Sequence, residues 1–234
     1  MQAPIDTSSP SLARAYDYLL GGRANFAADR ALAGRLQALY PRVSEVLSLS
    51  RTHTTAAVLH LSSTGVSQFI DIGAGLPTRP AVHEAALRGR RDARVIYVDR
   101  DPAVVSHAAA LLPTGARAIE GDLAEPEALL WTLRPLIDFS RPCCIVLSLV
   151  LQALDPALAQ AVTGVLTTAL APGSYLIVSC GAGEAGRLPD TVSGAGLSAD
   201  EFHSLFAGLD LLPQVPGAVA PDPGLLLFGI GRTP

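Results

Sequence analysis

Residues 68–78 read QFIDIGAGLPT, a short apolar run that ends in an aspartate and a Gly-x-Gly turn. Such a run, closed by glycines, predicts a buried β-strand that turns into a helix. Gly73 and Gly75 would let a ligand approach the backbone closely, and the helix that follows would offer free N–H groups. We therefore expect a ligand site at the carboxyl end of this strand.

Similar apolar runs recur along the chain and alternate with segments of helical pattern. We expect strands over residues 68–72, 93–99, 116–122, 143–151 and 174–180, and helices over residues 78–88, 102–111, 125–133 and 157–170. This alternation predicts an α/β fold, with a mostly parallel sheet covered by helices on both faces. Residues 209–215 and 224–231 are predicted to add an antiparallel pair at the sheet edge, because prolines surround them.

The first 65 residues contain no strand pattern. Helices are predicted over residues 11–20, 27–40 and 43–61, each ended by glycine or proline. We therefore expect a helical segment over residues 1–65 and an α/β domain over residues 66–234.

The composition excludes several classes of protein. Charged residues make up 16% of the 234 residues and apolar residues 49%, which excludes a disordered chain. All 17 basic residues are arginines, so a catalytic lysine or a P-loop lysine is impossible. The net charge of −4 argues against a broad nucleic-acid surface. Residues 142–183 form a long apolar stretch, but Asp155-Pro156 and Pro172-Gly173 interrupt it, so no membrane span is expected. The N-terminus lacks a signal-peptide pattern, and we therefore expect a cytoplasmic protein.

The cysteines and the single tryptophan favour structural roles. Cys143, Cys144 and Cys180 lack the spacing of metal ligands, so buried thiols in a reducing compartment are expected and no metal site is predicted. Trp131 is expected to pack a helix against the sheet.

Three successive predicted strands end near an aspartate, namely Asp71, Asp99 and Asp122. Because the carboxyl ends of parallel strands meet at one edge of a sheet, these carboxylates would line that edge. Asp71 would attract a cation such as an ammonium or a sulfonium. Asp99 could accept hydrogen bonds from both hydroxyls of a ribose, and Asp122 from an amine of adenine.

A dinucleotide fits this edge poorly. The dinucleotide fingerprint requires a third glycine where Thr78 stands, and Pro77 removes one N–H group from the would-be phosphate site. Asp71 would also repel a pyrophosphate. An NAD-dependent reductase is therefore disfavoured.

In order along the chain, these motifs resemble class I S-adenosylmethionine-dependent methyltransferases, and more narrowly the actinobacterial DUF574 methyltransferase family. The resemblance covers residues 11 to about 180 and rests on ARAYDYLLGGRANFAADR (13–30), FIDIGAGLPT (69–78), VIYVDRDP (95–102), AIEGDL (118–123), DFSRP (138–142) and LAPGSYLIVSC (170–180). It implies a Rossmann-like fold with a seven-stranded sheet. Residues 66–234 would bind S-adenosylmethionine, and residues 1–65 would form a helical lid.

The resemblance implies roles for the matching residues. The methionine part of the cofactor would be held by Asp71, Gly73 and Gly75. Asp99 would bind the ribose, Asp122 and Leu123 would frame the adenine, and Ser148 would face the methyl group and the substrate. The lid over the cofactor would contain Tyr16, Tyr18, Gly21, Gly22, Arg23 and Asn25. Of these, Tyr16, Tyr18 and Arg23 are the candidate catalytic residues at the reacting end.

Two segments depart from the family pattern. Ser50-Arg51 stands where members often carry Asn-Arg, and residues 149–155 stand where members are rich in aromatic residues. Both differences fall where a substrate would be recognised.

The resulting hypothesis is methyl transfer from S-adenosylmethionine to a small molecule in specialised metabolism. The acceptor would attack the sulfonium methyl group in line, and alignment in a dry site would supply much of the catalysis. One alternative is a non-methylating reaction of the same cofactor, either an intramolecular displacement or a cyclisation. The other is a non-catalytic adenosyl-binding scaffold, for which the apolar composition would supply a homodimer face.

Overall fold

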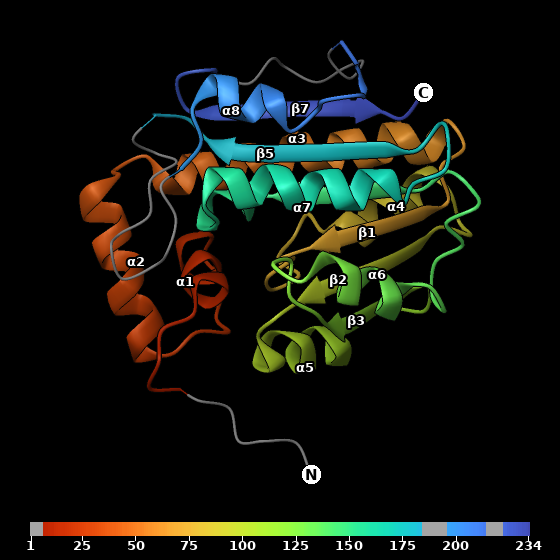
Figure 1. Ribbon diagram of the computed structural model, residues 1–234. Coiled ribbons are helices and arrows are strands. Elements are labelled where there is room, and N and C mark those ends of the chain that lie inside the picture. The colour runs from red at the N-terminus through yellow and green to blue at the C-terminus, as the bar shows by residue number, and fades with distance from the viewer. Residues whose placement is uncertain (1–6, 184–195, 214–221) are drawn as a thin grey trace.

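The computed structural model describes residues 7–183, 196–213 and 222–234. Within these residues, seven strands form one sheet in the order β3-β2-β1-β4-β5-β7-β6 (Figure 1). The strands are β1 (Gln68–Ile72), β2 (Arg94–Asp99), β3 (Ala116–Glu120), β4 (Cys144–Ser148), β5 (Tyr175–Gly181), β6 (Asp210–Leu211) and β7 (Leu226–Arg232). Strands β1 to β5 are parallel, and β7 runs antiparallel to both β5 and β6. The predicted α/β class and the mostly parallel sheet are confirmed.

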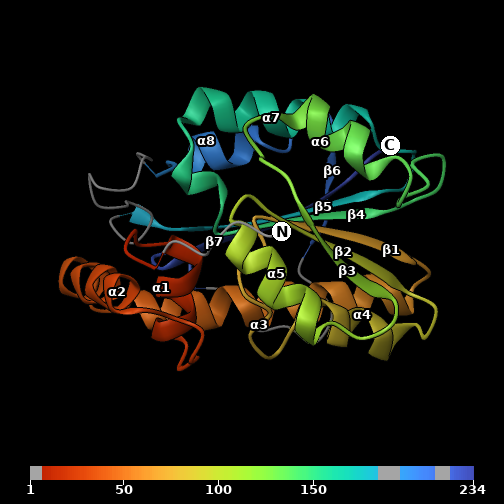
Figure 2. The same ribbon diagram turned by 90° about the horizontal axis from the view of Figure 1, so that it is seen from below.

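Helices cover both faces of this sheet (Figure 2). The helices are α1 (Leu12–Leu19), α2 (Ala27–Leu39), α3 (Val43–Ser63), α4 (Val82–Gly89), α5 (Pro102–Leu111), α6 (Pro126–Leu133), η1 (Leu151–Ala153), α7 (Pro156–Thr168) and α8 (Ala199–Ser204). Helices α6, α7 and α8 lie on one face, and α3, α4 and α5 lie on the other. None of the helices in the described ranges has the length and apolarity that a membrane span requires.

Strand β4 shows why the central strands are rich in apolar residues. Ile145 and Leu147 belong to the core beneath α6, α7 and α8. The alternate residues Cys144 and Val146 belong to the core beneath α3 and α4. Since both faces of the strand are buried, both sets of side chains must be apolar.

Helix α3 belongs to the packed core rather than to a separate lid. Ala57, Val58 and Leu61 pack in the same apolar cluster as β1 and β2. Ser62 Oγ also donates a 2.7 Å hydrogen bond to the carbonyl of Ala86 in α4. Of the N-terminal helices, α1 and α2 stand beyond the carboxyl ends of the strands, while α3 packs against the sheet. The division of the chain at residue 65 stays a prediction.

Three local predictions differ from the structure. The fourth strand ends at Ser148 instead of residue 151, because Leu149 adopts a left-handed φ of 55° and a 3₁₀ turn follows. The helix expected from residue 78 begins at Val82, since Pro80 restricts the residue before it to non-helical conformations. Trp131 is 76% exposed and does not pack against the sheet.

A buried ion-pair network fastens the lid helices α1 and α2 to the sheet edge. Arg14 Nε lies 2.9 Å from Oδ2 of Asp29 in α2. Arg14 Nη1 lies 2.9 Å from Oδ2 of Asp101, at the start of α5. The Asp29 side chain is fully buried and also accepts hydrogen bonds from the backbone N–H groups of Ser11 and Phe26. One arginine therefore joins both lid helices to the loop that follows β2.

Replacing Arg14 with glutamine should loosen the lid without unfolding the sheet. Removal of one partner from a buried ion pair costs about 3–5 kcal/mol, since the remaining charge stays desolvated. Hydrogen exchange measured by mass spectrometry should show backbone amides of residues 12–39 exchanging at least ~100-fold faster. Arg42→Gln, which breaks an exposed pair with Glu45, should change little. Unchanged lid protection in Arg14→Gln would show that this network does not hold the lid.

Candidate functional site

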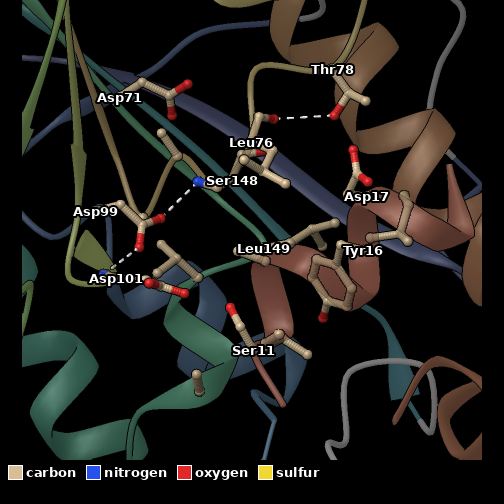
Figure 3. Close-up of a pocket in the computed structure, with 18 of the residues that line it drawn as sticks. Ser11, Tyr16, Asp17, Asp71, Leu76, Thr78, Asp99, Asp101, Ser148 and Leu149 are labelled. Atoms are coloured by element: carbon tan, nitrogen blue, oxygen red, sulfur yellow. Dashed lines mark hydrogen bonds between the residues drawn. The ribbon is translucent and has the colours of Figure 1, made fainter. Parts of the chain in front are cut away.

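A cavity of about 780 Å³ lies at the carboxyl ends of β1, β2 and β4, beneath α1 (Figure 3). Its volume falls within the range of small-molecule and cofactor sites. Its walls come from the lid, from α3, and from the segments that follow β1, β2, β3 and β4. The cavity includes all of the residues that the sequence assigned to a cofactor, which are Asp71, Gly73, Gly75, Asp99, Asp122, Leu123 and Ser148.

The turn after β1 forms the floor of this cavity. Gly73 and Gly75 have φ values of 67° and 61°, in the left-handed region that glycine adopts without strain. A side chain at position 73 would also overlap the side chain of Val150. The turn therefore brings its backbone N–H groups close to the strand ends because these two positions are glycines.

Asp99, the last residue of β2, organises the adjoining loops. One carboxylate oxygen accepts a 2.8 Å hydrogen bond from Gly75 N, and the other accepts a 2.9 Å bond from Asp101 N (Figure 3). Burial raises the pKa of Asp99, whereas the two N–H donors lower it. Each carboxylate oxygen has a further lone pair, so the group can still accept hydrogen bonds from a diol.

Asp71 is a buried carboxylate without a partner. It is only 6% exposed, yet no hydrogen bond or ion pair links its carboxylate to another of the described residues. Burial raises its pKa to about 7; nearby Arg51 acts against this shift, and Asp99 adds to it. A cation placed in the cavity beside Asp71 would therefore favour the charged carboxylate.

Arg51, on the inner side of α3, is a lining residue that the sequence did not single out as a binding residue. Its Nη1 donates a 2.6 Å hydrogen bond to the carbonyl of Thr78. Its Nε is enclosed by protein and has no partner among the described residues. Burial lowers the pKa of the guanidinium, and the nearby Asp71, Tyr97 and Asp17 act in the opposite direction. Arg51 and Asp71 are thus close enough to interact, yet neither is hydrogen-bonded to the other.

The third aspartate, Asp122, follows β3 at the far side of the cavity. Its carboxylate accepts a 2.9 Å hydrogen bond from Ala124 N, which fixes the turn after the strand. The neighbouring Leu123 is buried and packs against the core. A polar group and an apolar surface thus lie next to each other, as a flat heterocyclic ring requires.

Ser148 lies within a cluster of hydroxyl groups at the end of β4. Its Oγ is 2.8 Å from Ser50 Oγ, 3.1 Å from Ser179 Oγ and 3.3 Å from Thr54 Oγ1. Ser50 and Thr54 project from α3, while Ser179 lies on β5. The hydroxyl of Ser148 is thus held by its neighbours as it lines the cavity.

Tyr16 is a lid residue that reaches the cavity. Gly181 N donates to Gln152 Oε1 at 2.9 Å, so the side-chain amide of Gln152 must direct its NH₂ group toward Tyr16. This NH₂ group donates to the phenol oxygen of Tyr16 at 3.3 Å. Burial raises the pKa of Tyr16, so the phenol stays protonated. The phenol oxygen is therefore an acceptor from Gln152, and its own proton is left to donate elsewhere.

Tyr18 and Arg23 do not line the cavity. Tyr18 is 43% exposed and Arg23 is exposed. Residues two apart on a helix point in nearly opposite directions, so Tyr16 and Tyr18 cannot both face inward.

Asp17 is a lining residue that sequence reasoning missed. It lies one position after Tyr16, on the cavity side of α1. Its carboxylate accepts hydrogen bonds from Ala24 N and Asn25 Nδ2, and thereby shapes the loop that follows α1. A side chain at Gly22 would collide with this carboxylate. The helical spacing of Ala13, Asp17 and Leu20 is the signal that could have identified it.

Other reactive groups lie away from the cavity. Cys143, Cys144 and Cys180 are free and buried, and burial raises the pKa of each thiol. Within the described ranges, no group of His, Cys, Asp and Glu side chains could hold a metal ion.

Comparison with known proteins identifies the family. The family described as S-adenosyl methyltransferase matches residues 1–222. No curated protein matches the chain. A protein from Thermobifida fusca that has been assigned as a methyltransferase is 36% identical, with a TM-score of 0.87 and coverage of 97% of this chain and 96% of that one.

Two further structures are similar. A DUF574 family protein from Streptomyces avermitilis is 28% identical, with a TM-score of 0.88 over 99% of this chain and all of that one. The N-methyltransferase NodS from Bradyrhizobium japonicum, solved with S-adenosyl-L-homocysteine, is 18% identical and shares the fold, with a TM-score of 0.57 over 94% of this chain and 99% of that one. The chain therefore belongs to the S-adenosyl methyltransferase family, and it is a methyltransferase that depends on S-adenosylmethionine.

Proposed function

We propose that the enzyme methylates a small molecule that enters the lid end of the cavity. The observation that supports this proposal is that α1 and the segment after β4 enclose the same cavity that contains the strand-end carboxylates. A space of about 780 Å³ suits a cofactor and a small acceptor, whereas a large macromolecular surface would require an open face. A place in specialised metabolism stays a prediction.

The cofactor assignment fits the polar groups along the cavity. In our proposal Asp99 accepts hydrogen bonds from the ribose hydroxyls, and Asp122 and Leu123 hold the adenine. Gly73 and Gly75 let the backbone approach the cofactor, while Asp71 faces its cationic end. When bound, the cofactor supplies an activated sulfonium methyl group and leaves as a neutral thioether. The protein therefore needs to align the acceptor and exclude water more than to stabilise a new anion.

The lid end of the cavity suits an acceptor with a largely apolar body. Leu20, Leu32, Leu47, Leu149 and Leu154 line it. We propose that Tyr16 contacts the acceptor there, because the phenol oxygen accepts from the NH₂ group of Gln152 and its own proton is left to donate. Ser148 would complete the polar surface near the transferred methyl group.

A calorimetric titration tests the cofactor site. The purified wild-type enzyme should bind S-adenosylhomocysteine and should not bind NAD. Asp99→Ala should weaken S-adenosylhomocysteine binding by about 10- to 100-fold, since hydrogen bonds to a buried charge contribute about 1.5–3 kcal/mol. Asp92→Ala, which removes an exposed carboxylate, is the matched control and should bind normally. If Asp99→Ala and wild type bound S-adenosylhomocysteine with equal affinity, the result would contradict the proposal that Asp99 binds the ribose.

The Tyr16 proposal requires a turnover measurement. We expect Tyr16→Phe to keep wild-type affinity for S-adenosylhomocysteine but to reduce methyl transfer by ~10-fold or more, because one donor to the acceptor is lost. The assay would follow S-adenosylhomocysteine formation with a panel of small amines, phenols and thiols. Tyr18→Phe, altered on the opposite side of α1, is the control.

The same assay separates the alternatives. Equal rates for Tyr16→Phe and wild type with every acceptor that is turned over would contradict the role of Tyr16. Methylthioadenosine as the product would instead indicate a displacement within the cofactor, and binding without turnover would favour the scaffold alternative.

A further inference from the structure

Two opposite charges line one end of the cavity, and neither has an ionic partner among the described residues. The carboxylate of Asp71 makes no hydrogen bond there. The guanidinium of Arg51 makes a single one, from Nη1 to the carbonyl of Thr78. Nε of Arg51 is enclosed and without a partner, and no described residue accepts from Nη2. Four of the five N–H groups of the guanidinium are therefore unused.

Such an arrangement is costly in the free protein. An ionised group that is removed from water loses several kcal/mol, roughly, unless a counter-charge and hydrogen bonds replace its hydration. A direct ion pair between Arg51 on α3 and Asp71 on β1 would relieve this cost, but the two side chains interact only through their charges and share no hydrogen bond. Each charge is offset by the other only at a distance and without a hydrogen bond, so this end of the cavity is complementary to a ligand that carries both signs.

An α-amino acid group has this pattern of charge. Its ammonium would compensate Asp71, and its carboxylate would compensate Arg51. The guanidinium also offers a planar pair of donors, which matches the two oxygens of a carboxylate. The Thr78 carbonyl fixes the orientation of that plane through Nη1, so the guanidinium is positioned before the ligand arrives.

We propose that Arg51 binds the carboxylate of the amino-acid group of the cofactor, opposite the ammonium at Asp71, and so selects cofactors in which this group is intact. The proposal rests on the cofactor assignment above. It adds a specificity residue from α3, a helix outside the glycine turn and the strand-end aspartates. It also explains why the turn continues through Leu76, Pro77 and Thr78, because Thr78 supplies the carbonyl that holds Arg51.

Ligands that differ by one group provide the test. S-adenosylmethionine, decarboxylated S-adenosylmethionine and 5′-methylthioadenosine are titrated calorimetrically into wild type and Arg51→Gln. We expect wild type to bind decarboxylated S-adenosylmethionine about 10- to 100-fold more weakly than the intact cofactor, as for the loss of a hydrogen-bonded charge. In Arg51→Gln this ratio should fall to about one.

The third ligand and two further variants act as controls. Methylthioadenosine lacks the whole amino-acid group, so its affinity should be the same in wild type and Arg51→Gln, which also shows that the variant is folded. Arg51→Lys should recover part of the discrimination against decarboxylated S-adenosylmethionine, because lysine restores the positive charge but not the planar pair of donors. Arg35→Gln, altered on the exposed side of α2, should match wild type.

Three results would contradict the proposal. Unchanged discrimination in Arg51→Gln would show that another group binds the carboxylate. An equal loss of affinity for all three ligands would show that Arg51 only shapes the cavity. If wild type bound none of the three ligands, the cofactor assignment would itself fail, and this outcome is distinct from the other two.

Discussion

The site depends on the burial of two carboxylates, Asp71 and Asp99, at the ends of neighbouring parallel strands. Burial raises the pKa of both groups, and the negative charge of Asp99 raises the pKa of Asp71 further. Asp99 is stabilised by two backbone N–H donors, one of them from the glycine turn. Asp71 has no such donors in the described structure, so its negative charge is left to interact with what enters the cavity.

This difference has a consequence for stability. A free aspartate has a pKa near ~4, whereas burial raises the pKa of Asp71 to about 7. Between these values the folded protein binds more protons at this position than the unfolded chain does. Asp71 therefore makes the free protein less stable as the pH rises from about 4 to about 7. A ligand cation beside the carboxylate removes this cost, which couples folding of the site to cofactor binding.

Much of the fold follows from local sequence patterns. Strands buried on both faces are largely apolar, so β1, β2 and β5 could be predicted from runs rich in apolar residues. The end of β4 could not, because Leu149 and Val150 are as apolar as the strand itself, and only the left-handed backbone at Leu149 ends it. The exposed position of Trp131 could not be predicted either, because residue type alone does not show which side of a helix packs against the sheet.

The part of the candidate site that lies at the strand ends could be predicted from the order of strands and helices in the sequence. Asp71, Asp99 and Asp122 reach one cavity because parallel strands end at one edge, a rule that the sequence pattern already contains. Arg51 was not predictable in this way, since its role depends on how α3 packs across the sheet. Asp17 could have been identified, since helical spacing places it on the inner side of α1, but the family resemblance drew attention to Tyr18 and Arg23 instead.

The most direct test of the account is the proton balance of S-adenosylhomocysteine binding, measured by calorimetry in buffers of different ionisation heat. Arg51, Asp99 and Tyr97 face Asp71, so Asp71→Asn is titrated in parallel to isolate its contribution. At pH 6, binding to wild type should release about one proton per site, and affinity should rise toward pH 8. Asp71→Asn should lose this release. The same proton release in both proteins, or none in wild type, would contradict the claim that the cofactor's ammonium compensates Asp71.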